Sequence, residues 1–200
     1  MDVCHLILAS RSPRRQQLLE EVGITAQAVP ADIDELTDHP ESPRSLAQEN
    51  AYRKALVLSS SHPESVVIAA DTIVVFDGEI FGKPESLEVA HSMLTRLAGR
   101  THEVITGVCL SRFATKTIVQ FEEVTHVRFR PLSSADIDEY LRTIDPLDKA
   151  GGYSAQEDRH RLIEGIQGSL TNVIGLPMER TIAAISGHFP ELSPNGTTHS

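Results

Sequence analysis

Three arginines and two serines lie near the start of the chain, in the segment 10–15, which reads Ser-Arg-Ser-Pro-Arg-Arg. A Ser-Pro pair after a short apolar run predicts the first residues of a helix. The unpaired backbone N–H groups of a helix start favour anions, and guanidinium groups bind phosphate oxygens through paired hydrogen bonds. Ser10, Arg14 and Arg15 are therefore candidate ligands of an anion. The alternative is a basic turn that faces only water.

A single carboxylate, Asp71, interrupts an apolar stretch that runs from Val66 to Phe76. A buried carboxylate must be paired, hydrogen-bonded or bound to a metal, because leaving it bare costs several kcal/mol. The carboxyl ends of buried strands are also where α/β proteins place their ligands. Asp71 is therefore a candidate catalytic group. The alternative is a structural carboxylate that caps a neighbouring turn.

Three lysines stand in apolar or glycine-containing surroundings, namely Lys54, Lys83 and Lys149. One such lysine usually extends its amine to water along an apolar surface. Several together predict a local anion pocket in a chain whose 18 Lys+Arg and 28 Asp+Glu give a net charge of −10. That charge argues against binding of a long nucleic acid, and an aromatic fraction of 4% leaves few residues for base stacking. A small polyanion is the better match.

The sequence lacks the motifs of several other kinds of chemistry. The nine histidines form no HExxH spacing, and there is neither a Walker A segment nor GxGxxG. Cys4 and Cys109 are isolated, so they predict neither a disulfide framework nor a zinc site. No apolar run approaches the roughly 20 residues of a membrane span, and the N-terminus lacks the basic start of a signal peptide. We expect a cytoplasmic protein without a membrane partner.

Alternating strand and helix patterns must position these groups. Strand signals cover residues 5–9, 66–76, 102–113, 117–132 and 162–166, with a hairpin turn at Asp77-Gly78. Helix signals cover 13–22, 43–58, 86–97, 133–144 and 178–185, while 30–43 and the glycine-rich 165–177 indicate loops. This mixture predicts an α/β fold with a mixed, twisted sheet flanked by helices. Residues 1–187 are expected to form one domain, and 188–200 a polar, flexible tail.

Six motifs follow one another in order between about residues 5 and 187: Ala9-Ser10-Arg11-Ser12-Pro13-Arg14-Arg15, Ala70-Asp71-Thr72, Gly82-Lys83-Pro84, Gly99-Arg100-Thr101-His102, Asp148-Lys149-Ala150-Gly151-Gly152-Tyr153, and Gly168-Ser169 with Asn172-Val173-Ile174-Gly175-Leu176-Pro177. Together they resemble the Maf family of nucleoside triphosphate pyrophosphatases. The resemblance implies two lobes around a central nucleotide cleft, as in inosine triphosphate pyrophosphatases. It also implies hydrolysis to a monophosphate and pyrophosphate with a divalent cation, Mg²⁺ or Mn²⁺. Homodimers occur in that family.

The resemblance assigns roles to individual residues. It makes Asp71 the proton acceptor, or a metal ligand together with Glu35, and the sequence leaves these two roles of Asp71 open. It places one hydroxyl and four cations around the triphosphate, namely Ser10, Arg14, Arg15, Lys54 and Lys83. Thr72, with Arg14 and Gln156, matches positions linked to a preference for dTTP and UTP. The implied partner is thus a nucleoside triphosphate, natural or with a modified pyrimidine.

Two residues depart from the family pattern in the loop that carries Gln156. Ser154 and Glu157 stand where the family commonly has glycines. Glycine at such positions serves positive φ or a close approach, so both changes bear on base recognition. Hydrolysis of dTTP and UTP is the function we expect. The alternative is a nucleotide-binding regulator of cell division or septum formation that does not turn over its ligand.

Overall fold

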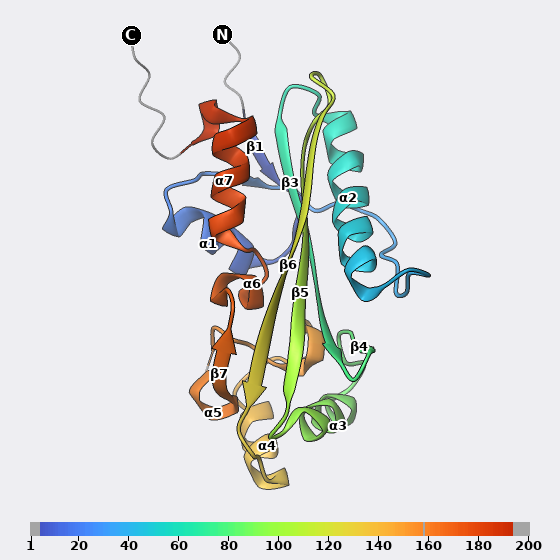
Figure 1. Ribbon diagram of the computed structural model, residues 1–200, viewed down its shortest axis with the longest axis vertical. Helices are drawn as coiled ribbons and strands as arrows, with labels where there is room; N and C mark the ends of the chain where they lie inside the picture. The colour runs from blue at the N-terminus through green and yellow to red at the C-terminus, as the bar shows by residue number, and fades with distance from the viewer. Residues whose placement is uncertain (1–4, 158, 194–200) are drawn as a thin grey trace. The chain divides into compact units, whose positions relative to one another are not determined.

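A computed structural model describes residues 5–157 and 159–193 (Figure 1). Its strands are β1 Leu6–Leu8, β2 Gln27–Ala28, β3 Val66–Phe76, β4 Glu79–Phe81, β5 Thr101–Arg112, β6 Thr117–Phe129 and β7 Ile163–Gln167. Its helices are α1 Pro13–Glu21, α2 Pro43–Ser61, α3 Leu87–Leu97, α4 Ser134–Leu141, α5 Arg159–Leu162, α6 Leu170–Ile174 and α7 Met178–His188, with 3₁₀ turns η1 Ala150–Gly152 and η2 Pro190–Leu192. Strands and helices therefore alternate as the patterns predict.

The strands of the described residues form one seven-stranded sheet in the order β2-β1-β3-β5-β6-β7, with β4 paired to β3. β1 runs parallel to β2 and β3, so that Ile7 lies opposite Gln27 on one side and Val67 on the other. β4 on β3 and β7 on β6 are antiparallel. The sheet is therefore mixed, and the predicted fold class is confirmed.

The chain divides into two compact units. The first takes in the described residues of Met1–Asp71, Thr106–Glu122 and Gly175–Ser200. The second takes in the described residues of Thr72–Ile105 and Glu123–Ile174. β3, β5 and β6 each contribute residues to both units, and the boundary on β3 falls between Asp71 and Thr72.

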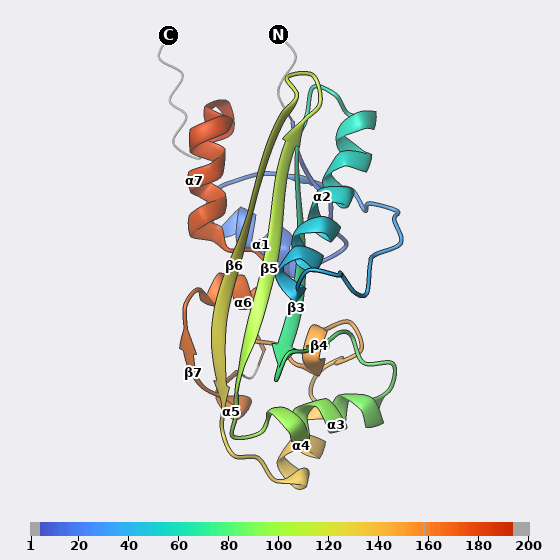
Figure 2. The same cartoon turned by 45° about the vertical axis from the view of Figure 1, so that its right-hand side comes forward.

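In the first unit, α2 lies on one face of the strands and α1 and α7 lie on the other (Figures 1 and 2). Small residues allow α2 to approach closely: Ala51 and Ala55 are fully buried and pack in a cluster with Val67. Gly107 on β5 is part of the same contact, since a Cβ there would lie 2.4 Å from the carbonyl carbon and oxygen of Ala47. Only glycine therefore permits this spacing between β5 and the α2 backbone.

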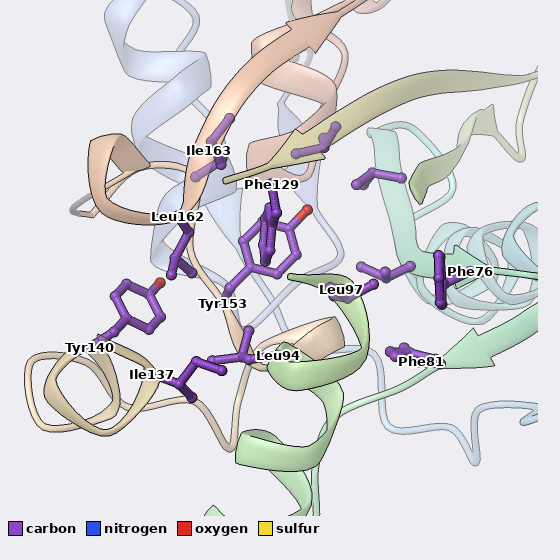
Figure 3. Packing of buried hydrophobic residues seen from close by; sticks show 14 residues of the cluster. Phe76, Phe81, Leu94, Leu97, Phe129, Ile137, Tyr140, Tyr153, Leu162 and Ile163 are labelled. Carbon is purple, nitrogen blue, oxygen red and sulfur yellow. The ribbon is translucent and has the colours of Figure 1, made fainter. Parts of the chain in front are cut away.

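The second unit has its own aromatic and aliphatic core, shown in Figure 3. The rings of Phe129 and Tyr153 meet edge to face with centroids 4.9 Å apart. Leu94 and Leu97 of α3 and Ile137 of α4 join the same cluster. These helices begin as their sequences predict, because Ser86 and Ser133 accept hydrogen bonds from N–H groups in the first turns of α3 and α4.

Several predicted boundaries differ from the structure, and one predicted loop contains a helix. α2 runs to Ser61 rather than to residue 58, and α7 runs to His188 rather than to residue 185. β6 ends at Phe129 rather than at residue 132, because Pro131 has no N–H to continue a ladder. α4 ends at Leu141 rather than at residue 144, where Thr143 N–H donates to Tyr140 O in a tighter turn. The segment 165–177 contains α6, which is too short for its apolar spacing to be recognised.

The predicted tail, 188–200, is described as far as residue 193. His188 is the last residue of α7, Phe189 is buried, and η2 follows. Residues 194–200 and Cys4 lie outside the described residues. The division into one domain and a tail stays a prediction. None of the described helices combines the length and the hydropathy of a membrane span.

Candidate active site

Asp71 is buried on β3, and both of its carboxylate oxygens accept hydrogen bonds. Lys54 Nζ donates to Oδ1 over 2.8 Å, and Asn50 Nδ2 donates to Oδ2 over 3.2 Å. These contacts supply the partners that a buried carboxylate requires. The buried carboxylate of Asp71 is thus one member of a hydrogen-bonded charge pair.

Lys54 contacts a second carboxylate in the same unit. Its Nζ lies 2.7 Å from Glu35 Oε1, while the side chains of Lys54 and Glu35 are 8% and 50% exposed. The ammonium therefore bridges a buried carboxylate and a half-exposed one. This arrangement brings Asp71 and Glu35 within reach of one cation, although they are far apart in the sequence.

α2 presents Asn50 and Lys54 on the same face because the two residues are four positions apart. The helix begins at Pro43, where Ser42 Oγ accepts the Ser45 N–H as an N-cap. Asn50 also holds the preceding segment: Leu36 N–H donates to Asn50 Oδ1 over 2.8 Å, and Asn50 Nδ2 donates to Leu36 O over 2.9 Å. The segment that carries Glu35 is therefore fixed to α2 next to Asp71.

The turn between β1 and α1 forms the basic part of the site. Ser12 stands at the predicted N-cap without a side-chain capping bond, and its N–H donates to Ser10 Oγ over 3.0 Å. Arg15 Nη1 donates to the same hydroxyl over 3.3 Å, and Arg15 Nε donates to Gly175 O over 2.8 Å. The guanidinium of Arg15 is thus held by both the turn and the segment before α7.

Burial and the nearby carboxylates have opposite effects on the pKa of Arg15. Burial lowers the pKa of the Arg15 guanidinium, and the Asp71 carboxylate acts in the opposite direction. The positive charge of Arg14 lowers this pKa further, whereas Glu35 raises it. Arg14 and the two carboxylates that Lys54 bridges are therefore all near enough to Arg15 to shift its pKa electrostatically. Two arginines at a helix start also oppose the helix dipole, a cost that a bound anion would offset.

Three predicted site residues belong to the second unit. Thr72 follows Asp71 directly on β3. Lys83 is exposed, just after β4. Gln156 is exposed and its N–H donates to Ser154 Oγ over 3.3 Å. Six predicted site residues lie in the first unit, namely Ser10, Arg14, Arg15, Glu35, Lys54 and Asp71.

Ser154 organises the backbone around Gln156. Its Oγ also accepts the Glu157 N–H over 3.2 Å, and its own N–H donates to Tyr140 Oη over 3.0 Å. Neither Ser154 nor Glu157 has a positive φ; among the described non-glycine residues only Asp77 and Lys116 do. The backbone therefore does not require glycine at these positions, and Ser154 adds a local acceptor instead.

The carboxylates of Asp71 and Glu35 determine which metal the site could hold. Among the described residues no cluster of three or more His, Cys, Asp or Glu side chains could hold a metal ion. Mg²⁺ commonly binds one or two carboxylates together with waters and substrate phosphates. The two oxygen-donor side chains fit that pattern, and the Lys54 ammonium between them shows that they favour a cation.

A sequence model of a family described as "Maf-like protein" matches residues 5–188 of the chain. The chain belongs to the Maf family. One Maf relative, from Symbiobacterium thermophilum and named dTTP/UTP pyrophosphatase, is 47% identical over 181 residues, 90% of this chain and 92% of that protein. A relative of the same name from Clostridioides difficile is 41% identical over 185 residues, 92% of this chain and 95% of that protein.

The fold of this Maf chain is also found in a solved structure, that of the Staphylococcus aureus Ham1 protein. The two share a TM-score of 0.55 and 15% sequence identity over 92% of this chain and 98% of that chain. This likeness shows a common fold. The Maf motifs that carry Arg15 and Asp71 come together in the first unit, where Asn50 bonds to Asp71 and to Leu36, the residue after Glu35. Asn50 was not among the predicted site residues, although a polar residue within an apolar helix face was a visible signal.

Proposed function

We propose that this Maf protein is a nucleoside triphosphate pyrophosphatase that hydrolyses dTTP and UTP to the monophosphate and pyrophosphate. The observation that carries the proposal is the Lys54 ammonium held between Asp71 and Glu35, with Arg14 and Arg15 in the same field. Carboxylates beside a group of cations suit phosphoryl chemistry, in which the protein mainly positions groups and neutralises charge. The names of the relatives from Symbiobacterium thermophilum and Clostridioides difficile support dTTP and UTP as substrates.

In the proposed reaction, Asp71 acts on the attacking water. Each carboxylate oxygen of Asp71 accepts one hydrogen bond from the protein and retains capacity for another. The water oxygen forms a bond to the α-phosphorus, and its proton passes to the Asp71 carboxylate. The bond from the α-phosphorus to the bridging oxygen breaks, so pyrophosphate leaves with that oxygen.

The cations bind and orient the phosphates in this proposal. Arg14 and Arg15 offer guanidinium N–H groups to phosphate oxygens, Ser10 a hydroxyl, and Lys83 an exposed ammonium. Lys54 has three N–H donors, of which the contacts to Asp71 and Glu35 use two. Mg²⁺ or Mn²⁺ would be held by Glu35, and also by Asp71 where this carboxylate ligates the metal instead of acting as the base, and it would neutralise charge on the leaving pyrophosphate.

Base preference is assigned to three residues. Thr72, Arg14 and Gln156 match the positions that the family resemblance links to pyrimidine nucleotides, including modified ones. The ordered backbone at Gln156 supports a role in recognition, because Ser154 fixes its N–H. A cytoplasmic location and assembly as a homodimer remain predictions of the sequence and the family.

The direct test is a nucleotide panel with purified protein and Mg²⁺ or Mn²⁺, in which pyrophosphate and orthophosphate are measured separately. We expect pyrophosphate from dTTP and UTP with a kcat/KM at least tenfold above that for purine triphosphates, roughly 1.4 kcal/mol of discrimination. Release of orthophosphate would contradict the proposed bond cleavage. Tight binding without turnover under either metal would favour a nucleotide-binding regulator instead.

A further inference from the structure

We propose that Asn50 is a positioning residue of the hydrolysis reaction, which fixes the Asp71 carboxylate and the Glu35 segment in one arrangement. The inference rests on the proposed pyrophosphatase function. The hydrogen bonds of Asn50 are made to Asp71 and Leu36 rather than to the proposed phosphate ligands Arg14 and Arg15. It acts through Asp71 and through the segment that Leu36 anchors.

The amide of Asn50 lies in surroundings that otherwise suit an apolar side chain. Asn50 is 2% exposed, and the neighbouring α2 residues Ala47, Ala51 and Ala55 are fully buried. A buried amide is tolerated when its hydrogen bonds are made, and becomes costly when they are lost. Asn50 makes three: one from Leu36 N–H to its Oδ1, and two from its Nδ2 to Leu36 O and Asp71 Oδ2. Packing alone therefore does not account for an amide at this position.

These bonds link two groups that the reaction needs together. Asn50 Nδ2 holds one oxygen of Asp71, while Lys54 Nζ holds the other. Leu36 follows Glu35 directly in the chain, so the paired bonds at Leu36 also fix where Glu35 meets Lys54. Without the amide, the Asp71 carboxylate could rotate and the Glu35 segment would lose its anchor. Misplacement of a reacting group by about 1 Å can cost on the order of 100-fold in rate.

The effect should fall on kcat more than on KM. Substrate affinity in the proposed site comes mainly from cations that bind the phosphates, and Asn50 provides none of their contacts. Loss of groups that orient a catalytic residue commonly costs about 10- to 100-fold in activity. We therefore expect Asn50→Leu to lower kcat for dTTP by that factor while KM changes by less than about threefold.

A second variant, Asn50→Asp, distinguishes the contact of Asn50 with Leu36 from its contact with Asp71. Asn50→Asp keeps an acceptor for the Leu36 N–H, but it replaces the Nδ2 donor with an oxygen and places a second negative charge beside Asp71. We expect kcat to fall in both variants. Hydrogen exchange of the Leu36 amide should become fast in Asn50→Leu and stay slower in Asn50→Asp. If Asn50 had a merely structural role, kcat and the exchange of the Leu36 amide would change together in the two variants.

Asn172→Leu is the matched control. Asn172 is a fully buried asparagine of the second unit, and its Nδ2 donates to Val104 O and Thr125 Oγ1 over 3.0 and 2.9 Å. Its replacement should lower the free energy of unfolding as Asn50→Leu does, without changing exchange at Leu36. A loss of kcat in Asn50→Leu at a temperature where both variants are folded then reports position rather than stability.

The proposal is overturned if both Asn50 variants keep kcat within about threefold of wild type, or if the Leu36 amide exchanges equally fast in wild type and Asn50→Leu. It is supported if kcat falls about 10- to 100-fold with KM retained and exchange differs as described. If wild-type protein releases no pyrophosphate from dTTP or UTP, the proposed function fails. Hydrogen exchange of the Leu36 amide would still test in that case whether Asn50 anchors Leu36. Failure of the proposed function can therefore be distinguished from failure of the Asn50 proposal.

Discussion

Lys54 and Asp71 form a buried ion pair, in which Nζ lies 2.8 Å from Oδ1 and the side chains are 8% and 10% exposed. Removing one partner of a buried pair leaves the other charge without compensation, at a cost of about 3 to 5 kcal/mol. We expect Lys54→Met to lower the free energy of unfolding by roughly 3 kcal/mol, because half-exposed Glu35 adds little. Asp71→Asn in the same background should recover part of this loss.

A double-mutant cycle in urea measures the coupling between Lys54 and Asp71. The single variants and the double variant are each unfolded at neutral pH, and the interaction energy follows from the differences. A coupling above about 1 kcal/mol agrees with the buried pair. Additive effects would show that the two side chains act independently, contrary to the contact in the structure.

His102 makes stability depend on pH. Burial lowers the pKa of the His102 imidazole from 6.5 to about 4, and Nε2 pairs with Tyr153 Oη at 2.8 Å. The unfolded chain therefore binds a proton at a pH where the folded chain does not. The stabilisation is complete above pH 6.5 and is lost as pH falls toward 4, by about 3 kcal/mol in all.

Urea unfolding of wild type and His102→Gln between pH 4 and pH 7.5 checks this dependence. Glutamine does not titrate, so the difference in free energy of unfolding between the two proteins isolates the imidazole from the carboxylates. That difference should change by roughly 3 kcal/mol over the range. A constant difference would mean that His102 has the same pKa in the folded and in the unfolded chain.

Ser154 should influence nucleotide preference through Gln156. Its Oγ accepts the N–H groups of Gln156 and Glu157, and a hydrogen bond contributes about 0.5 to 1.5 kcal/mol. We expect Ser154→Gly to loosen this turn and lower kcat/KM for dTTP by on the order of tenfold, and Ser154→Thr to retain most of it. Steady-state kinetics with dTTP and UTP provide the measurement. Equal kcat/KM for wild type and Ser154→Gly would show that this turn does not contribute to base recognition.

The sequence predicted most of the fold because its signals are local. Ser42, Ser86 and Ser133 each mark a helix start that the structure has, and Gly23, which follows the predicted helix 13–22, has the left-handed φ of 77° that is typical of a helix C-terminus. The short elements β2, α5 and α6 escaped prediction because a few residues carry no periodicity. Their positions depend on tertiary contacts, which local patterns do not contain.

The residues of the candidate site were predicted one by one from the sequence, whereas their arrangement was not. Asp71 was identified from its charge within an apolar strand, and Lys54 from its place on an apolar helix face. The pairing of Lys54 with both Asp71 and Glu35 joins three distant segments, and no local spacing encodes it. The hydrogen bonds of Asn50 with Leu36 and Asp71 likewise join distant segments, so its place on an apolar helix face could mark it in the sequence but could not reveal its partners.

If Asp71 accepts the proton of the attacking water, the variant Asp71→Asn lacks the base of the reaction. Asparagine preserves the size of the side chain and an oxygen acceptor for Lys54, but it is not a base. Pyrophosphate release from dTTP with Mg²⁺ is measured for wild type and Asp71→Asn, with thermal unfolding to establish that both are folded. We expect kcat to fall about 1,000-fold in Asp71→Asn, within the range of general-base catalysis. A folded Asp71→Asn protein with kcat within tenfold of wild type would contradict this role of Asp71.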